Sequence, residues 1–260
     1  MNEIEKFSKM GIKRIIGVAS GKGGVGKSTT TVLLARALAS RGNKVAILDA
    51  DITGPSIPRL LGVEGIAGES DGEKLIPVSD PQGIKLISIN MFLKDEDDPV
   101  VWRGPLLSGA LRQFYQEADW GDIDYLIVDF PPGTADVVLT GLQQLPLDGL
   151  VVVATPQDFV SMIVSKSVKM AVKMNTPVLG LVENMGAMVC PHCSKEFRLF
   201  AQGAANDGAN KLGLPLLARF AWRQELAQAG ALDWEKLPND LRATAEGLAL
   251  EVHTAMAPRT

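Results

Sequence analysis

Residues 21–28, GKGGVGKS, constrain the fold of this chain more than any other stretch, because they match the pattern G-x-x-x-x-G-K-[S/T] in full. Such a loop needs a buried strand before it and a helix after it, so that backbone N–H groups and the helix N-terminus face the same anionic oxygens. The flanks fit, since residues 14–20 (RIIGVAS) are a short apolar run and residues 28–41 carry apolar side chains at helical spacing. The motif therefore predicts a phosphate-binding loop; a glycine-rich turn without a ligand is the alternative.

The residue types in the loop also indicate which parts of a nucleotide it contacts. The glycines allow the backbone to wrap with its N–H groups pointing inward, Lys27 is placed to reach β- and γ-phosphates, and the Ser28 hydroxyl is a ligand for Mg²⁺. We expect ATP and Mg²⁺ to bind here, through Gly21, Lys22, Gly23, Gly24, Val25, Gly26, Lys27, Ser28 and Thr29.

The rest of the chain alternates apolar runs with helical patterns. Residues 62–83 form a long Gly- and Pro-containing connection that has room for a small hairpin. Further buried strands are expected at residues 44–49, 84–90, 123–130, 149–156 and 177–184, and helices at 105–118 and 238–256. This alternation predicts an α/β fold with a mainly parallel, twisted sheet flanked by helices on both faces. We expect a single P-loop domain over residues 1–260, with its core at about 14–230 and a C-terminal helix at about 238–256.

Ligands of such sheets bind beyond the carboxyl ends of the strands. Asp129 ends the strand IDYLIVD, where a carboxylate is expected to hold Mg²⁺ through water; a cap on the following PPG turn is the alternative. Asp49 ends another strand and points to the same side as Asp51, so it is placed to support the site.

Cys190 and Cys193 are the only cysteines and form a C-x-x-C pair. This spacing lets two thiolates face one metal ion or one edge of a cluster. A four-thiolate site needs two more cysteines, which a two-fold homodimer supplies by repeating the same patch. A redox dithiol, a zinc site and a purely structural pair remain open, and the only histidines, His192 and His253, complete no familiar zinc spacing.

Composition narrows the class of protein. The formal net charge is −4, which argues against a broad nucleic-acid surface. No run is apolar for long enough to span a bilayer, and the N-terminal residues have no apolar core typical of a secretory signal. We therefore expect a cytoplasmic protein with reduced thiols, no membrane insertion and no nucleic-acid partner.

With its early lysine, the stretch GKGGVGKST (21–29) is similar to the deviant Walker A motif of the MinD/ParA/nitrogenase-iron-protein ATPases. The resemblance implies that Lys22 reaches the nucleotide of a partner subunit, and that Asp51 positions the attacking water and contacts the Mg²⁺ shell. It also implies that Asn184 reads the adenine edge. The alternatives are a surface lysine for Lys22, a turn cap for Asp51 and a loop-backbone contact for Asn184.

Longer stretches narrow the resemblance to the Mrp/ApbC (Mrp/NBP35) group of iron–sulfur cluster carrier ATPases. These are DADITGPSIPRLLG (49–62), VVWRGPLLSGAL (100–111), DWGDIDYLIVDFPPGTADVVLT (119–140), VVVATPQD (151–158) and VENMGAMVCPHC (182–193). Residues 219–230 depart from the group's proline-containing turn, which puts base contacts from that segment in doubt.

The resemblance implies a homodimer that binds a [4Fe–4S] cluster between paired Cys190 and Cys193, hydrolyses ATP slowly, and exchanges the cluster with a scaffold and apo-proteins. Lys22, Lys27 and Asp51 would be the catalytic residues. Two other interpretations are compatible with the same fold: a MinD/ParA-like spatial-organising switch, and an electron-transfer component like the nitrogenase iron protein.

Overall fold

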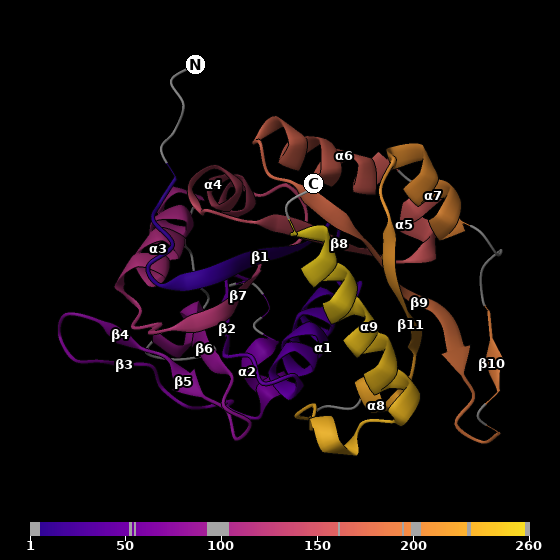
Figure 1. Ribbon diagram of the computed structural model, residues 1–260, viewed down its shortest axis with the longest axis horizontal. Helices are drawn as coiled ribbons and strands as arrows, with labels where there is room; N and C mark the ends of the chain where they lie inside the picture. The colour runs from indigo at the N-terminus through magenta and orange to yellow at the C-terminus, as the bar shows by residue number, and fades with distance from the viewer. Residues whose placement is uncertain are drawn as a thin grey trace.

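The computed structural model describes residues 6–51, 54, 56–92, 104–160, 162–193, 195–198, 204–227 and 230–257. At its centre lies a nine-stranded sheet in the order β10-β9-β8-β1-β7-β2-β6-β5, with β11 paired to β9 as well (Figure 1). The parallel strands are β1 (Ile12–Ser20), β2 (Val45–Asp49), β6 (Lys85–Ser88), β7 (Ile123–Asp129), β8 (Gly149–Ala154), β9 (Val178–Val189) and β11 (Leu216–Trp222). The short β5 (Val78–Ser79) and β10 (Glu196–Phe197) pair antiparallel to their neighbours, and β3 (Glu69–Ser70) and β4 (Leu75–Ile76) form a separate hairpin.

Helices cover both faces of this sheet (Figure 1). One layer contains α3 (Gly104–Glu117), α4 (Asp136–Gln144), α5 (Pro156–Val160), α6 (Met162–Lys173) and α7 (Ala204–Leu212). The other contains α1 (Lys27–Ser40), α2 (Ile57–Leu61) and α9 (Asn239–Ala255). The short elements η1 (Ile89–Phe92), α8 (Gln224–Ala227) and η2 (Trp234–Lys236) lie in connections. In the described part of the chain, no helix has both the length and the apolar character to cross a bilayer.

Alternation along the strands explains why the sheet is buried on both sides. Ile15 of β1 and Leu126 of β7 belong to one apolar core, whereas the next residues, Ile16 and Ile127, belong to the other. All four side chains are fully buried, as expected for a parallel sheet between two helix layers. The predicted fold class is therefore confirmed.

Two parts of the sheet differ from the sequence prediction. Strand β9 continues beyond Asn184 to Val189, and β11 was not predicted, because its run LLARFAW interrupts the apolar pattern with the exposed Arg219. As an edge strand, β11 forms its ladder only with β9, so it needs no continuous apolar run. Segment 219–230, which departs from the group's proline-containing turn, thus begins inside a strand. The small hairpin in residues 62–83 and the C-terminal helix are confirmed.

A buried ion pair ties helix α1 to two distant connections. Arg36 of α1 pairs with Asp80, which follows β5, and the two side chains are 2% and 0% exposed. Arg36 Nε also donates to the carbonyl oxygen of Leu232 at 3.1 Å, and Asp80 accepts the backbone N–H of Ile84 at 2.7 Å. This network therefore holds α1 against the β5–β6 turn and the segment before α9.

Replacing Arg36 by Met should strongly destabilise the fold, because the substitution leaves the Asp80 carboxylate buried without its guanidinium partner. We expect a loss of about 3–5 kcal/mol in the free energy of unfolding, measured by denaturant titration. Arg112→Met, at an exposed position of α3, is the matched control and should change it by less than about 0.5 kcal/mol. Equal effects of both variants would show that the buried pair contributes nothing specific.

Candidate functional site

The predicted carboxylates meet at one edge of the sheet, beside the glycine-rich loop. Strand β1 ends at Ser20, the loop follows, and α1 begins at Lys27. Asp129 at the end of β7 is in register with Val18 of β1 and with Asp49 of β2. The parallel order of β1, β7 and β2 thus brings together residues that lie far apart in the chain.

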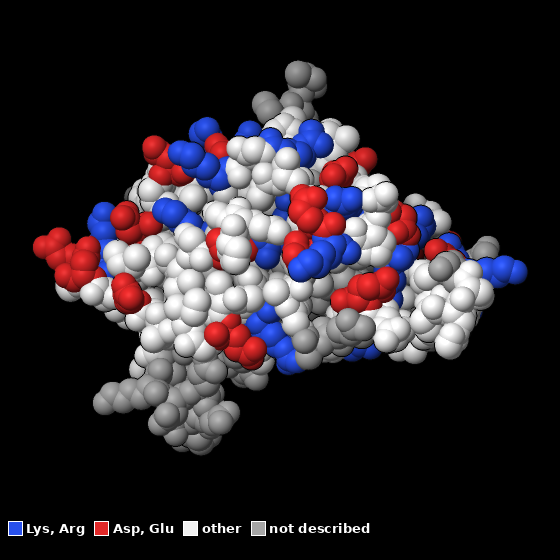
Figure 2. Space-filling view, turned by 90° about the horizontal axis from the view of Figure 1, so that it is seen from below, with Lys and Arg blue, Asp and Glu red and all other residues white. Residues whose placement is uncertain are grey.

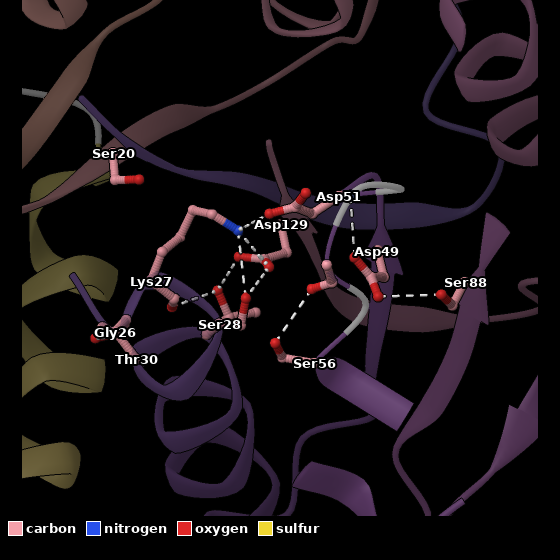
Figure 3. Close-up of polar contacts among 12 residues, drawn as sticks. Ser20, Gly26, Lys27, Ser28, Thr30, Asp49, Asp51, Ser56, Ser88 and Asp129 are labelled. Atoms are coloured by element: carbon pink, nitrogen blue, oxygen red, sulfur yellow. Dashed lines mark hydrogen bonds and ion pairs between the residues drawn. The ribbon is translucent and has the colours of Figure 1, made fainter. Parts of the chain in front are cut away.

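Lys27 lies at the centre of the polar contacts (Figure 3). Its ammonium nitrogen is 2.7 Å from Asp129 Oδ2 and 3.3 Å from Asp51 Oδ2. Asp129 Oδ2 also accepts the Ser28 hydroxyl at 2.7 Å, and Asp129 Oδ1 accepts the hydroxyl of Thr31 at 2.7 Å. Thr31 was not among the predicted site residues, although its place one helical turn after Lys27 is a usable signal.

These groups shift one another's ionisation. Burial disfavours the ammonium of Lys27, but the carboxylates of Asp129 and Asp51 outweigh it and raise the pKa of Lys27. Burial and the negative charge of Asp129 raise the pKa of Asp49 to about 8, against hydrogen bonds from the Asp51 N–H and the Ser88 hydroxyl. Asp49 is therefore protonated more readily than an exposed aspartate.

The same donors fit a hard divalent cation. The Ser28 hydroxyl and the carboxylates of Asp51 and Asp129 converge on the place where the structure holds the positive charge of Lys27. Oxygen donors of this kind suit Mg²⁺. Beside them opens a cavity of about 430 Å³ lined by the loop residues, Asp51, Pro132 and Met185. The roles of Ser28, Asp51 and Asp129 toward Mg²⁺ remain predictions that this donor set fits.

Lys22 is held by its own chain. Its nitrogen lies 2.8 Å from Oδ1 of Asp158, in the first turn of α5, and the Lys22 side chain is 42% exposed. Asp158 Oδ2 accepts both the N–H and the hydroxyl of Thr155, at 3.0 and 2.7 Å. Burial alone would raise the pKa of Asp158, but the hydrogen bonds from Lys22 and Thr155 lower it. Lys22 must leave Asp158 to reach a partner's nucleotide, so its role across a dimer remains a prediction.

Asn184 contacts the loop directly. Its side-chain amide donates to the carbonyl oxygen of Val25 at 2.9 Å, and its carbonyl oxygen accepts the N–H of Met185 at 3.0 Å. The left-handed Gly26 packs against it so closely that an added Cβ would lie 2.0 Å from Asn184 Nδ2. In this structure Asn184 supports the loop backbone, and its expected contact with adenine remains a prediction.

The cysteine pair lies on a hairpin that continues strand β9. Strand β10 pairs with Met188 and Val189 of β9, and the N–H of Cys190 donates to the carbonyl oxygen of Lys195 at 3.0 Å. Cys190 is half-buried, Cys193 is exposed, and both thiols are free. The N–H groups of His192 and Cys193, together with the Cys193 side chain, lower the pKa of the Cys190 thiol, which favours the thiolate that metals bind.

One copy of the hairpin offers too few ligands for a closed site. Across the described ranges, no group of three or more His, Cys, Asp or Glu side chains is placed to hold a metal ion. Closed four-coordinate thiolate sites need four protein ligands. Any closed site at Cys190 and Cys193 therefore needs ligands from outside this set of residues.

Comparison with known proteins agrees with this arrangement. Residues 11–249 match the family model of the NUBPL iron-transfer P-loop NTPases, within the ParA group. The chain belongs to this family. It is 50% identical over 225 residues to the "iron-sulfur cluster carrier protein" of Clostridium perfringens, covering 84% of this chain and 79% of that protein. The predicted resemblance to iron–sulfur cluster carrier ATPases of the MinD/ParA superfamily is thus confirmed.

Solved structures support the same family fold. A nucleotide-binding protein of Archaeoglobus fulgidus in complex with ADP is 38% identical, with a TM-score of 0.71 over 92% of this chain and 88% of that chain. The cell division ATPase MinD of Pyrococcus furiosus is 21% identical, with a TM-score of 0.61 over 93% and 99% of the two chains, and shows the fold alone. The loop and the cysteine hairpin therefore both belong to one NTPase fold.

Charged side chains of both signs are intermixed on the face shown in Figure 2. A nucleic-acid surface usually gathers Lys and Arg into a continuous patch. The intermixed face fits the expectation of no nucleic-acid partner, which remains a prediction.

The close packing of Gly26 on Asn184 makes a testable difference between two loop glycines. Gly24 and Gly26 both have positive φ, 77° and 81°, but an added Cβ at Gly24 meets no described atom within 4 Å. Gly24→Ala should cost only backbone strain, about 1–2 kcal/mol of unfolding free energy. Gly26→Ala should cost a further ~1–3 kcal/mol because it overpacks Asn184.

Denaturant unfolding without nucleotide would measure both costs. Adding Asn184→Ala to Gly26→Ala should recover part of the extra loss, whereas adding it to Gly24→Ala should recover none. Equal losses for the two glycine variants would mean that the Asn184 contact does not constrain the loop.

Proposed function

We propose that this chain is an ATP-dependent carrier of iron–sulfur clusters. It binds and slowly hydrolyses ATP, and as a homodimer it holds a [4Fe–4S] cluster between the Cys190 and Cys193 pairs of two copies. It receives the cluster from a scaffold and delivers it to apo-proteins in the cytoplasm. The cluster is cargo, whereas Mg²⁺ is the cofactor of hydrolysis.

The observation that carries this proposal is the path of strand β9. Asn184 in this strand is hydrogen-bonded to the loop backbone, and the same strand continues to Val189, the residue before Cys190. Family membership supports both ends of the path, because relatives of this chain are named as cluster carriers. A carrier that uses ATP needs such a connection between nucleotide and cargo.

The proposed hydrolysis assigns one task to each charged residue. Lys27 turns from Asp129 toward the β- and γ-phosphates, and Lys22 leaves Asp158 to contact the nucleotide of the partner subunit. Asp51 orients a water molecule for in-line attack, so that a bond from the water oxygen to the γ-phosphorus forms as the bond to the ADP oxygen breaks. The protons of that water end on the inorganic phosphate and in solvent. When bound by Ser28, Asp51 and Asp129, Mg²⁺ would neutralise phosphate charge.

Cluster binding requires two copies because each chain contributes two thiolates. A two-fold axis beside the hairpin would place four cysteines around one [4Fe–4S] unit. The N–H groups that favour the Cys190 thiolate would also suit a thiolate bound to an iron of the cluster. In this proposal both the nucleotide site and the cysteine hairpin require residues from a second copy of the chain.

Cluster loading tests the cargo directly. After anaerobic reconstitution with iron and sulfide, the wild-type protein should contain about four irons per dimer. Cys190→Ala/Cys193→Ala should contain almost none while still binding ATP, because the loop is untouched. Iron, acid-labile sulfide, zinc and oligomer mass would be measured on the same samples. No cluster, or zinc alone, would contradict the carrier proposal and favour a MinD/ParA-like switch.

The connection along β9 predicts that nucleotide state changes cluster release. Transfer to an apo-protein should differ between ATP and ADP by about fivefold or more, the lower end of measured allosteric couplings. Asn184→Ala should remove this difference at saturating nucleotide, because it cuts the bond to Val25. Asn210→Ala, on the exposed side of α7, is the control and should preserve it. Equal rates of cluster release with ATP and with ADP in the wild-type protein would contradict the coupling.

A further inference from the structure

Ser88 is the last residue of strand β6. It lies near the carboxylates of the candidate site but belongs to no motif of the loop. It is 1% exposed, and it lies in register with Asp49 at the end of the neighbouring strand β2. Its hydroxyl donates a hydrogen bond to Asp49 Oδ2 at 3.0 Å (Figure 3). A buried serine that faces a buried acid at a strand end is a candidate for orienting that acid.

Asp49 in turn contacts the backbone of Asp51. Its other oxygen, Oδ1, accepts the N–H of Asp51 at 3.1 Å. The preceding N–H, that of Ala50, donates to the carbonyl oxygen of Asp129 at 2.9 Å. The chain after β2 is thus held at two successive N–H groups, one by strand β7 and one by the Asp49 carboxyl group.

The position of that carboxyl group depends on Ser88. Asp49 is 1% exposed, so water cannot replace a lost partner on Oδ2 without a rearrangement. Without the hydroxyl, rotation of the Asp49 side chain would take Oδ1 away from the Asp51 N–H. The Asp51 carboxylate would then no longer be held at one place relative to the loop.

We propose that Ser88 is a positioning residue for ATP hydrolysis, which acts through Asp49 on the backbone of Asp51. This inference rests on the proposed ATPase function and deepens it. Ser88 touches neither phosphate nor water in this role. Its effect falls on the rate of the chemical step rather than on ATP affinity, because binding uses the loop N–H groups and Lys27, whereas in-line attack needs an accurately placed Asp51.

Single-turnover hydrolysis, with protein in excess over ATP, separates these quantities. For Ser88→Ala we expect the rate constant at saturating ATP to fall about tenfold, since a small misplacement of a catalytic group costs one to two orders of magnitude. The dissociation constant for ATP should change less than about twofold. Ser88→Thr keeps the hydroxyl and should recover most of the rate.

The chain offers a matched control. Ser167 of α6 is also buried, at 2% exposure, and its hydroxyl has no hydrogen-bond partner among the described residues. Ser167→Ala removes the same atom from a comparable environment and should leave the rate unchanged. Thermal unfolding of both alanine variants would show whether any loss of rate reflects a loss of folded protein.

A double-mutant cycle with Asp49→Asn keeps the test decisive if Ser88→Thr packs poorly. Ser88→Ala should slow hydrolysis less in the Asp49→Asn background than in wild type, because the two groups act in series. A Ser88→Ala rate equal to that of Ser167→Ala, or a loss confined to ATP affinity, would overturn the inference while the carrier proposal stands. Wild-type protein that binds ATP but does not hydrolyse it would overturn both.

Discussion

The buried carboxylate of Asp129 is the constraint on which the rest of the site depends. It is 0% exposed, and its two oxygens accept Lys27, Ser28 and Thr31. A fully buried charge is tolerated only when such partners surround it. Because all three partners lie within the first five residues of α1, Asp129 also holds that helix and its loop against strand β7. The geometry of the candidate site and local stability therefore rest on the same contacts.

Motif and periodicity were sufficient to predict the loop, the layered fold and most strands, since each of these follows from local residue types. The hydrogen-bond partners of individual side chains were not predictable in this way. For Asn184 the sequence left a contact with adenine and a contact with the loop backbone both open, and only the path of β9 beside the loop reveals the hydrogen bond to the Val25 carbonyl oxygen. Ser88 was missed because a serine at a strand end carries no signal until the fold shows which acid it faces, whereas the helical spacing of Thr31 from Lys27 could have been used. Strand β11 was missed because it lies at an edge and interrupts its apolar pattern with Arg219.

Strand β9 is under local strain where it passes the loop. Met185 has a φ of +60°, an uncommon value for a side chain of this size, and it borders the cavity beside Asp51 and Gly26. Its N–H is held by the Asn184 carbonyl oxygen, so the contact that supports the loop also maintains the strained residue. Strain of this kind persists only where the surroundings over-determine the backbone, and it is often found at switch regions. A conformational change in the loop would then alter the direction of β9 at Met185. This is three residues before Met188, where β9 begins to pair with β10.

The contact between Lys22 and Asp158 gives the proposed dimer a thermodynamic condition. In one copy the lysine is already satisfied at 2.8 Å, so dimerisation must replace an existing ion pair rather than satisfy a free charge. Because Lys22 is partly exposed, solvent screens this ion pair, and breaking it costs little free energy. A nucleoside triphosphate facing Lys22 offers more negative charge than one carboxylate and more than a nucleoside diphosphate, so it would offset the loss best. The same lysine would thereby make association depend on the γ-phosphate, and the four-thiolate site would form only in the state that binds it.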